Sequence, residues 1–518
     1  MGEHEQPLAS SSPTAAPFAA VHSPDKLDDT AAPALAVAPI QPTWVLYASV
    51  LITLLHPFQF GWSLSQVNLS TFSNNDDCAA RPVAEGTCLM FPGHTTTEWS
   101  FVVNSWIVGG MIGSLGCGFV SERFGRKKTL LLNCLFMIAG AVVQASASSV
   151  TVFVVGRVLA GVASGCATGL IGGYVNEISP PHLRNSLGMG LQISLCCGIF
   201  FVVCTFFFAN TSSGWRYIAA FPVVNAALFL AFAPWIMVES PVWLLANGKH
   251  DEAERVLARL YGDENVQTAL AWLEVGAGSS DGETAGMISE DCGVEESATD
   301  EKQSALASLL SRDYRWQLTI AIAIAAVQQL SGVNAVFYYS SDIFNKAGIA
   351  DDRIGSVIVN AVNVVPTIFA GGLAHRFGNR RLLLGGMIDM LISAVGMTIA
   401  FSVESPALSI LFTATYVAGF GFSIGPLLYV VAADLFPSHL RATGLSLCIC
   451  CNWIANLIIG IGFPHVADAL DDLSFLPFVA ILAFFTAFTY KAVPETSGKT
   501  SQEIQAEFHP HLAKEYRV

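Results

Sequence analysis

The chain has 518 residues, of which 53% are hydrophobic and only 13% are charged, and its mean hydropathy is +0.54. A soluble globular domain carries about 25% charged residues, so this composition excludes an ordinary soluble protein and predicts a polytopic membrane protein. The formal net charge of −15 at pH 7 does not indicate a nucleic-acid partner, because much of it lies in residues 281–301 and in loops on one side of the expected membrane spans.

The first 43 residues differ from the rest of the chain. They are rich in alanine, proline and serine, a composition that buries too little apolar surface to fold and predicts a disordered tail. They also lack the basic start and the early apolar core of a cleaved signal peptide. We therefore expect residues 1–43 to be a tail outside the membrane.

Twelve apolar segments follow, each close to the roughly 20 residues that a helix needs to cross a bilayer. They cover 44–66, 98–120, 129–148, 151–174, 186–208, 217–238, 316–340, 353–374, 381–402, 407–431, 442–463 and 474–492. A long polar stretch, 239–314, divides them six and six. The sequence thus predicts an all-α membrane protein with six-helix halves at 44–238 and 315–492 and a short tail at 493–518.

The polar stretch that separates the halves has two parts of different character. Residues Asp251 to Tyr261 alternate charged and apolar side chains, a pattern typical of an amphipathic helix on the membrane face. Residues Gly276 to Glu301 are acidic and rich in serine and glycine, which predicts disorder.

Basic residues fall on one side of the expected spans. The loops on that side carry Arg123, Arg126, Lys127, Lys128, Arg184, Arg376, Arg380, Arg381 and Arg441, whereas the opposite loops are acidic. Because basic loops stay in the cytoplasm, we expect both termini and residues 239–314 to be cytoplasmic and the protein to be a multi-pass protein of the plasma membrane.

Two features of the opposite loops follow from this orientation. Asn68 and Asn210 each begin an Asn-x-Ser/Thr tripeptide and are candidate glycan acceptors. Cys78 and Cys88 share one polar loop; a disulfide and two free thiols both remain open, the first requiring that the loop face outside. The other cysteines lie mostly in apolar runs without metal-ligand spacing, so we expect no metal site.

The seventh span contains an unusual group of amides. Gln328, Gln329 and Asn334 offer several hydrogen-bond donors and acceptors and no charge, which suits a neutral solute rich in hydroxyl groups. They converge more easily if the helix breaks at Ser331-Gly332, since glycine weakens a helix interior by about 1 kcal/mol. A broken helix around a polar midplane site is a feature of transporters. The alternative is polar packing between helices.

The two halves repeat each other. The run from Arg123 to Lys128, RFGRKK, returns as RFGNRR from Arg376, and the PHLR that begins at Pro181 returns as PSHLR at Pro437. Glu239-Ser240-Pro241 is echoed by Pro494-Glu495-Thr496. The separations between the copies nearly agree, which indicates a duplicated six-span unit. Two parallel halves with a site between them describe the major facilitator architecture.

These motifs resemble a known family. The run GFVSERFGRK from Gly118 is similar to the cytoplasmic signature of the major facilitator superfamily. Further motifs narrow the resemblance to sugar porters, closest to the facilitative glucose transporters: Gly156-Arg157, Glu239-Ser240-Pro241, Gln328 to Ser340, Asn452-Trp453 and Val493 to Thr496. The resemblance covers about residues 44–500 and implies a passive transporter of hexoses.

The resemblance also implies the residues that bind sugar and those that gate the path. The sugar-binding positions correspond to Gln192, Gln328, Gln329, Asn334, Asn363, Tyr429, Asn452 and Trp453. Asn360 and Asn456 lie about one helical turn from two of them, and Gln59-Phe60-Gly61 matches a family motif in span 1. Each amide alone could serve helix packing, but together they need a shared polar cavity.

The gating residues implied by the resemblance form two groups. Tyr338 and Tyr339 correspond to the outer gate. The inner gate is expected to pair cytoplasmic arginines with carboxylates, in contacts that break as the halves rock. Its members are Arg123, Arg126, Arg157, Arg184, Arg376, Arg441, Glu177, Glu239, Asp434 and Glu495. Anchoring of the arginines at lipid headgroups is the alternative.

Several positions depart from the family pattern. Proton-coupled members carry an aspartate in span 1 where this chain has Ser63, which favours a uniporter without proton coupling. Tyr429 replaces a tryptophan and Gly421 a glutamate in span 10, which puts strict glucose selectivity in doubt. Asp389 lies well inside span 9, and no motif assigns it a role.

We therefore expect facilitated transport of D-glucose, with D-fructose use also credible, by a monomer in a lipid bilayer without cofactors. A proton-sugar symporter is the first alternative, and a non-transporting nutrient receptor is the second. A receptor would need a long signalling tail, whereas 493–518 is short. No nucleophile–base or metal cluster suggests an enzyme.

Overall fold

The computed structural model describes residues 40–73, 75–278, 306–346, 351–499 and 501–508. Every regular element in these ranges is a helix. The first half contains α1 (Trp44–Thr53), α2 (Leu55–Ser65), α3 (Ser70–Ser73), α4 (Asn75–Ala79), α5 (Thr96–Phe124), α6 (Arg126–Ser146), α7 (Val150–Ile178), α8 (Arg184–Gly188), α9 (Gly190–Ala209) and α10 (Gly214–Ile236). The predicted disorder in 1–43 and 276–301 falls almost entirely outside the described residues.

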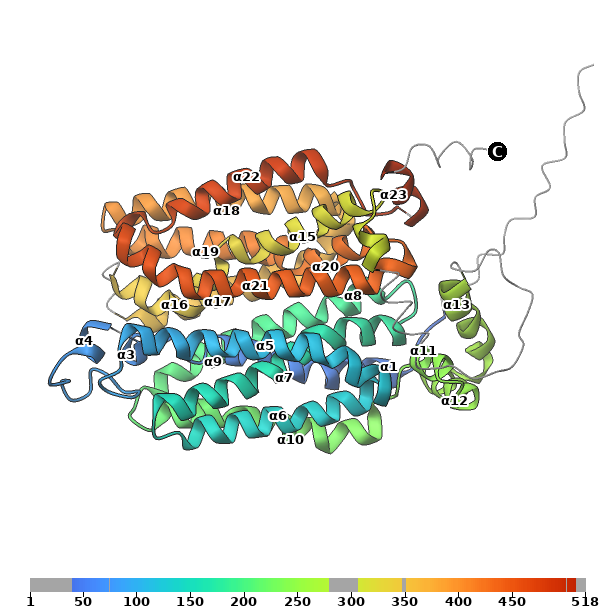
Figure 1. Ribbon diagram of the computed structural model, residues 1–518, viewed down its shortest axis with the longest axis horizontal. Coiled ribbons are helices and arrows are strands. Elements are labelled where there is room, and N and C mark those ends of the chain that lie inside the picture. Colours follow the sequence, from blue (N-terminus) through green and yellow to red (C-terminus); the bar gives the residue numbers. More distant parts are fainter. Residues whose placement is uncertain (1–39, 74, 279–305, 347–350, 500, 509–518) are drawn as a thin grey trace, which may run out of the picture. The chain divides into compact units, whose positions relative to one another are not determined.

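The remaining helices form a linker and a second half (Figure 1). The linker contains α11 (Pro241–Ala246), α12 (His250–Tyr261), a 3₁₀ turn (Asp263–Asn265) and α13 (Val266–Gly278). The second half contains α15 (Arg315–Leu330), α16 (Val333–Lys346), α17 (Asp352–Phe377), α18 (Asn379–Ser402), α19 (Pro406–Phe422), α20 (Ile424–Asp434), α21 (Ser438–Leu470), a 3₁₀ turn (Asp471–Leu473) and α22 (Leu476–Ala492). Helix α23 (Ser501–Phe508) follows.

Eleven helical stretches within the described residues are long and apolar enough to cross a bilayer. The shorter apolar helix α22, with 17 residues, occupies the twelfth predicted position. The large side chains exposed on these helices are apolar, for example Phe119, Trp235 and Phe484. A lipid environment satisfies such surfaces, whereas water does not. The predicted polytopic helical fold is confirmed.

The duplication seen in the sequence has a structural counterpart. Helices α6 and α18 each begin after a glycine with positive φ, Gly125 at 89° and Gly378 at 90°. One Oε1 atom of Glu239 accepts hydrogen bonds from the N–H groups of Arg126 and Lys127 at the start of α6, and Glu495 does the same at the start of α18. A carboxylate stabilises a helix N-terminus because it satisfies free N–H groups and opposes the helix dipole.

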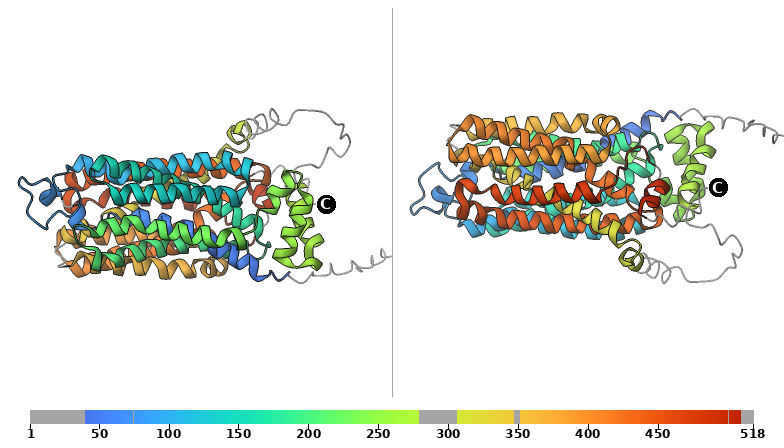
Figure 2. Two further views of the ribbon diagram at one scale, coloured as in Figure 1. Left: turned by 90° about the horizontal axis from the view of Figure 1, so that it is seen from below. Right: turned by 90° about the horizontal axis from the view of Figure 1, so that it is seen from above.

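Within each half the helices pack closely, and a few helices join the halves. In the first half, α5 and α7 approach so closely that a Cβ on Gly165 would overlap the carbonyl oxygen of Gly110. The halves meet where α9 contacts α17, where α5 contacts α21 and where α2 contacts α16 (Figure 2). These contacts between the halves therefore involve six helices, three from each half.

Two of the described spans are broken. The tenth breaks at Ser423, between α19 and α20, whereas the first keeps helical backbone angles at Leu54, between α1 and α2. The seventh breaks between α15 and α16 at Ser331-Gly332, as the sequence predicts. Gly332 has φ +87°, a backbone conformation that residues other than glycine rarely adopt.

The two ends of the helices are distinct. One, called the disulfide end here, carries α3, α4 and the loop in which Cys78 and Cys88 form a disulfide. The other, the basic end, carries the RFGRKK and RFGNRR turns and the linker helices (Figure 1). The amphipathic helix predicted in the linker is α12, whose Leu257 and Leu260 are buried.

Candidate functional site

A cavity of about 60 Å³ lies between the halves, near the middle of the helices. Its lining includes seven of the eight residues that the sequence assigns to sugar binding: Gln192, Gln328, Gln329, Asn334, Tyr429, Asn452 and Trp453. One water molecule needs about 10–15 Å³ of such space, so the cavity holds only a few waters and is smaller than a hexose needs. The site is therefore contracted in this conformation.

The second half supplies a connected network of amides to this cavity. Gln329 Nε2 donates to Asn452 Oδ1 at 2.9 Å, and Asn452 Nδ2 donates to Gln328 Oε1 at 2.8 Å. Asn334 Nδ2 donates to Gln329 Oε1 and, at 2.9 Å, to Asn456 Oδ1. The break at Gly332 lets the amides of α15 and α16 face the same neighbours on α21.

Gln328 also connects this network to the broken tenth span. Its Nε2 atom donates to the main-chain oxygens of Ile424 at 3.3 Å and Gly425 at 3.0 Å. These carbonyls lie just after the break at Ser423, where regular helical hydrogen bonding is interrupted. A change at the cavity-lining amides can thus be transmitted directly to α20, which carries Tyr429.

An aromatic cluster covers the first-half side of the cavity. The ring centroid of Trp453 lies 5.9 Å from that of Phe60 and 5.7 Å from that of Trp106. A Cβ on Gly110 would overlap the indole of Trp453, so the absence of a side chain at Gly110 lets the indole reach α5. Aromatic faces suit the apolar faces of a sugar ring, whereas amides suit its hydroxyls.

Asn363 lies beside the cavity and is not part of its lining. It is 1% exposed, its Nδ2 donates to the Cys196 thiol at 3.4 Å across the α9–α17 contact, and its Oδ1 has no partner. Cys196 also lies 3.8 Å from Thr367 Oγ1. In this conformation the Asn363 side chain thus contacts Cys196 of the first half and, unlike the other seven residues, does not line the cavity.

The sequence assignment omitted several lining residues. Phe60, Thr168, Phe420 and Asn456 all line the cavity. Asn456 had a recognisable signal, since it follows Asn452 by one helical turn. Phe60 lies in the Gln59-Phe60-Gly61 motif of span 1, Phe420 is indistinguishable from a core aromatic in the sequence, and Thr168 lies in a run of small residues.

Hydrogen bonds close the disulfide end between the halves. Ser65 Oγ on α2 donates to the main-chain oxygen of Phe337 on α16 at 2.9 Å. Asn68 Nδ2 donates to Ser340 Oγ at 2.8 Å, and Tyr338 OH donates to Asn456 Oδ1 at 3.0 Å. Tyr338 thereby connects the closed end to the amide network. The side chain of Tyr339 lies outside the described residues.

The contact of Asn68 contradicts its assignment as a glycan acceptor. Asn68 is 2% exposed, and the nitrogen that would carry the glycan is the one that bonds Ser340. Asn210 is half-buried, and its Oδ1 accepts from Thr71 Oγ1 at 2.8 Å, so Asn210 stays a prediction.

We expect the change Asn68→Gln to leave the electrophoretic mobility of the protein unchanged, because a glycan on Asn68 would prevent closure of the disulfide end. The change Asn210→Gln should instead remove the mobility shift that enzymatic deglycosylation produces. Immunoblots of both variants, made in a eukaryotic host with and without the deglycosylating enzyme, measure this. A mobility shift lost in Asn68→Gln would contradict the expectation.

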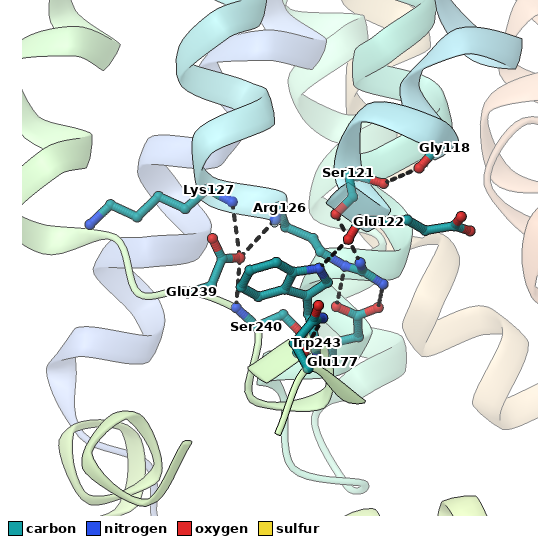
Figure 3. A network of polar contacts seen from close by, with 10 residues as sticks. Gly118, Ser121, Glu122, Arg126, Lys127, Glu177, Glu239, Ser240 and Trp243 are labelled. Carbon is teal, nitrogen blue, oxygen red and sulfur yellow. Dashed lines mark hydrogen bonds and ion pairs between the residues drawn. The ribbon is translucent and has the colours of Figure 1, made fainter. Parts of the chain in front are cut away.

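At the basic end of the first half, a network of polar contacts joins Arg126, Glu177 and Glu239 (Figure 3). Arg126 and Glu177 form a bidentate ion pair with N–O distances of 2.8 and 2.9 Å. Trp243 Nε1 donates to the main-chain oxygen of Glu122 at 2.7 Å, which fixes α11 against α5. Arg123 and Arg376 are exposed and lie over the neighbouring rings of Phe124 and Phe377.

Two further arginines of the basic end come from opposite halves. Arg184 Nε donates to the main-chain oxygen of Ser179, and Arg441 Nε donates to that of Ala433. Burial lowers the pKa of Arg184, and the neighbouring charge of Arg441 lowers this pKa further, against an opposing effect of Tyr261. Asp434 lies near Arg441. The two guanidinium groups repel each other, which disfavours closing the basic end.

The expectation that Arg157 belongs to the basic end is wrong. Arg157 is fully buried, and its guanidinium donates to the main-chain oxygens of Ser63 at 2.6 Å and Val102 at 3.1 Å. Both acceptors lie in the part of the bundle nearer the disulfide end. The reason is that α7 begins at Val150 on that side, so Arg157 lies only two turns into the helix.

Comparison with known proteins agrees with this architecture. The family profile described as "Sugar (and other) transporter" matches residues 49–508. The chain is 33% identical over 483 residues to "Solute carrier family 2, facilitated glucose transporter member 4" of Homo sapiens, covering 90% of this chain and 91% of the relative. It is 32% identical over 457 residues to "Plastidic glucose transporter 4" of Arabidopsis thaliana, covering 86% and 77%.

Solved structures show the same fold. The xylose transporter XylE from E. coli in a partially occluded inward-open conformation superposes with a TM-score of 0.71 at 23% identity, covering 88% of this chain and all of that one. The proton:xylose symporter XylE bound to 6-bromo-6-deoxy-D-glucose gives 0.72 at 24% identity, covering 90% and 99%. The chain therefore has the fold of these structures, belongs to the sugar transporter family and is a multi-pass membrane transporter, not an enzyme.

Proposed function

We propose that this protein is a uniporter that moves hexoses, with D-glucose as the main substrate, down their concentration gradient by alternating access. The observation that carries the proposal is the network of uncharged amides and aromatic rings in a cavity between the two halves. Such groups match the hydroxyls and the apolar faces of a sugar ring. Hydrogen bonds to sugar replace hydrogen bonds to water, so the net affinity stays moderate and release remains fast.

The contracted cavity belongs to one stage of this cycle. The halves would rock about the site, opening the disulfide end when Ser65 and Asn68 release α16, and opening the basic end in the opposite stage. The orientation that we propose puts the disulfide end outside the cell and both termini in the cytoplasm, because the basic loops lie at the other end. Tyr338 would then serve the outer gate, and the Arg126–Glu177 pair would serve the inner one.

The surroundings of Arg157 favour uniport over proton symport. The guanidinium of Arg157 is fully buried beside Ser63 and donates to the main-chain oxygens of Ser63, Val102 and Val103. The side chain at position 63 cannot bind a proton reversibly near neutral pH, because a serine hydroxyl does not titrate there. The cavity lining likewise contains no carboxylate or histidine.

We expect that the change Ser63→Asp alters the pH profile of hexose transport. A carboxylate at position 63 would lie beside the buried cation of Arg157 and could exchange a proton as the halves move. Transport rates of Ser63→Asp and Ser63→Asn in liposomes, measured across a range of pH, test this. Ser63→Asn is the uncharged control of similar size, and equal pH profiles for the two variants would refute the role given to position 63.

The experiment that tests the proposed function is counterflow in liposomes containing the purified full-length protein. Labelled D-glucose should accumulate transiently in vesicles preloaded with unlabelled D-glucose, with or without a pH gradient. Unlabelled D-fructose on the inside tests whether it shares the path, which the replacement of tryptophan by Tyr429 makes credible. Vesicles that show no counterflow with any hexose would exclude the proposal, and accumulation that needs a proton gradient would favour a symporter.

A further inference from the structure

Asp389 is a carboxylate near the middle of a membrane-spanning helix. It is the eleventh of the 24 residues of α18, so about 15 Å of helix separates it from one end and about 20 Å from the other. Ionisable side chains at this depth are costly, and they normally have a functional role. Asp389 does not line the central cavity, so sugar binding does not account for it.

The position of the carboxylate is defined by α19. A Cβ built on Gly419 would lie 2.6 Å from Asp389 Oδ2, so the carboxylate lies directly on the backbone of α19. Asp389 is half-buried, and Ile388 and Ile392 beside it are exposed on the outer face of the bundle. The side chain thus lies at the edge between the lipid-facing surface and the α18–α19 contact.

The charged neighbours of Asp389 in the described chain do not compensate it. The carboxylate is half-buried against Gly419, and no charged partner among the described residues is found for it. The titratable groups on the helices packed against α18 are Tyr416 on α19, Tyr429 and Asp434 on α20, Tyr490 and Lys491 on α22, Asp471 and Asp472 on the 3₁₀ turn, and Asp352, Arg353, His375 and Arg376 near the two ends of α17. An isolated carboxylate in an apolar environment becomes neutral by taking up a proton, since the ionised form loses its hydration there.

The same contact adjoins the break in the tenth span. Gly386, one turn before Asp389, packs against the side chain of Ser423, and Ser423 Oγ donates to the main-chain oxygen of Gly419. Gln328 bonds the carbonyls of Ile424 and Gly425 directly after that break. An unbroken series of contacts therefore joins Asp389, the Ser423 break and the sugar-facing amide of Gln328.

We propose that Asp389 is a proton-binding site that controls the break at Ser423, so that the rate of hexose transport depends on pH through this one residue. The neutral carboxyl group fits against Gly419 in the present conformation. When Asp389 releases its proton, the carboxylate needs water, the α18–α19 contact loosens, and conformations with a different α19–α20 angle become more populated. Asp389 lies outside the cavity, so the proton returns to the side from which it came, and transport remains uniport. This inference rests on the proposed hexose transport.

The test uses equilibrium exchange of labelled D-glucose in liposomes containing the full-length protein, with the same pH on both sides of the membrane. Between about pH 5 and about pH 8 the exchange rate of the unchanged protein should vary at least about fivefold, the lower end of usual coupling between two sites. Asp389→Asn and Asp389→Ala, which are neutral at every pH, should show flat profiles. Glu404→Gln, which removes an exposed carboxylate just after α18, should keep the original profile.

The outcomes separate this inference from the proposed function. Unchanged protein that exchanges no hexose at any pH overturns the transport proposal and with it this one. Exchange that does not depend on pH, or a pH profile that persists in both Asp389 variants, overturns the proton site alone. A pH indicator inside the vesicles gives the last control, because net proton movement with sugar would overturn the claim that the proton returns to its own side.

Discussion

The change Gln328→Ala should lower hexose uptake at low sugar concentration by about 30- to 150-fold. Gln328 makes four hydrogen bonds: two to the main-chain oxygens that follow the break in the tenth span, and two through its Oε1 atom, from Asn452 and Gln329. Alanine would leave the two main-chain oxygens without this donor, at a cost of about 1–3 kcal/mol each, whereas Gln329 Nε2 and Asn452 Nδ2 keep their other acceptors. A net loss of about 2–3 kcal/mol gives the stated reduction.

A matched control lies on the same helix. Gln317 is fully buried on α15, and its Nε2 donates to Gln505 Oε1 at 2.8 Å, far from the cavity lining. Gln317→Ala should therefore keep the sugar concentration that gives half-maximal uptake, even if it lowers the amount of protein. Uptake divided by the number of protein molecules at the cell surface separates an effect on transport from an effect on the amount of protein. Gln328→Ala with uptake within about twofold of the unchanged protein would mean that the amide network does not bind sugar.

The fold could be predicted largely from local features of the sequence. The lengths of the apolar segments predicted the membrane spans, because a helix in lipid must satisfy the hydrogen bonds of its own backbone. The glycine of Ser331-Gly332 marked the break in the seventh span, because its conformational freedom acts locally. The repeated turns at Gly125 and Gly378 also follow from short motifs, which recur with the same geometry in both halves.

Contacts between segments far apart in the sequence could not be predicted from such local features. The bond between Asn68 and Ser340 joins residues 272 positions apart, and a glycan tripeptide carries no information about it. The rotation that turns Asn363 toward Cys196 depends on how α17 packs on α9. Arg157 is different, since its position near the start of the predicted span 151–174 already placed it away from the basic loops. The resemblance to the family motif nevertheless placed Arg157 among the inner-gate arginines.

The change Gly332→Ala should reduce hexose transport by about tenfold or more while α15 and α16 still insert in the membrane. The left-handed backbone at Gly332, φ +87°, costs a residue with a Cβ about 1–2 kcal/mol. The new Cβ would also lie 2.6 Å from the ring of Phe478 on α22, which is 4% exposed and has little room to move. Both effects push the seventh span toward a continuous helix.

A continuous helix would separate the amides that the break brings together. Gln328 and Asn334 are six residues apart, which on a straight helix places them about 120° apart around the axis, so Asn334 could no longer reach both Gln329 and Asn456. The change Gly372→Ala on α17 is the control, because nothing lies within 4 Å of a Cβ there. Adding Phe478→Ala to Gly332→Ala should restore transport only in part, since it relieves the clash but not the backbone conformation. Full transport in Gly332→Ala alone would show that the glycine break is not needed to assemble the site.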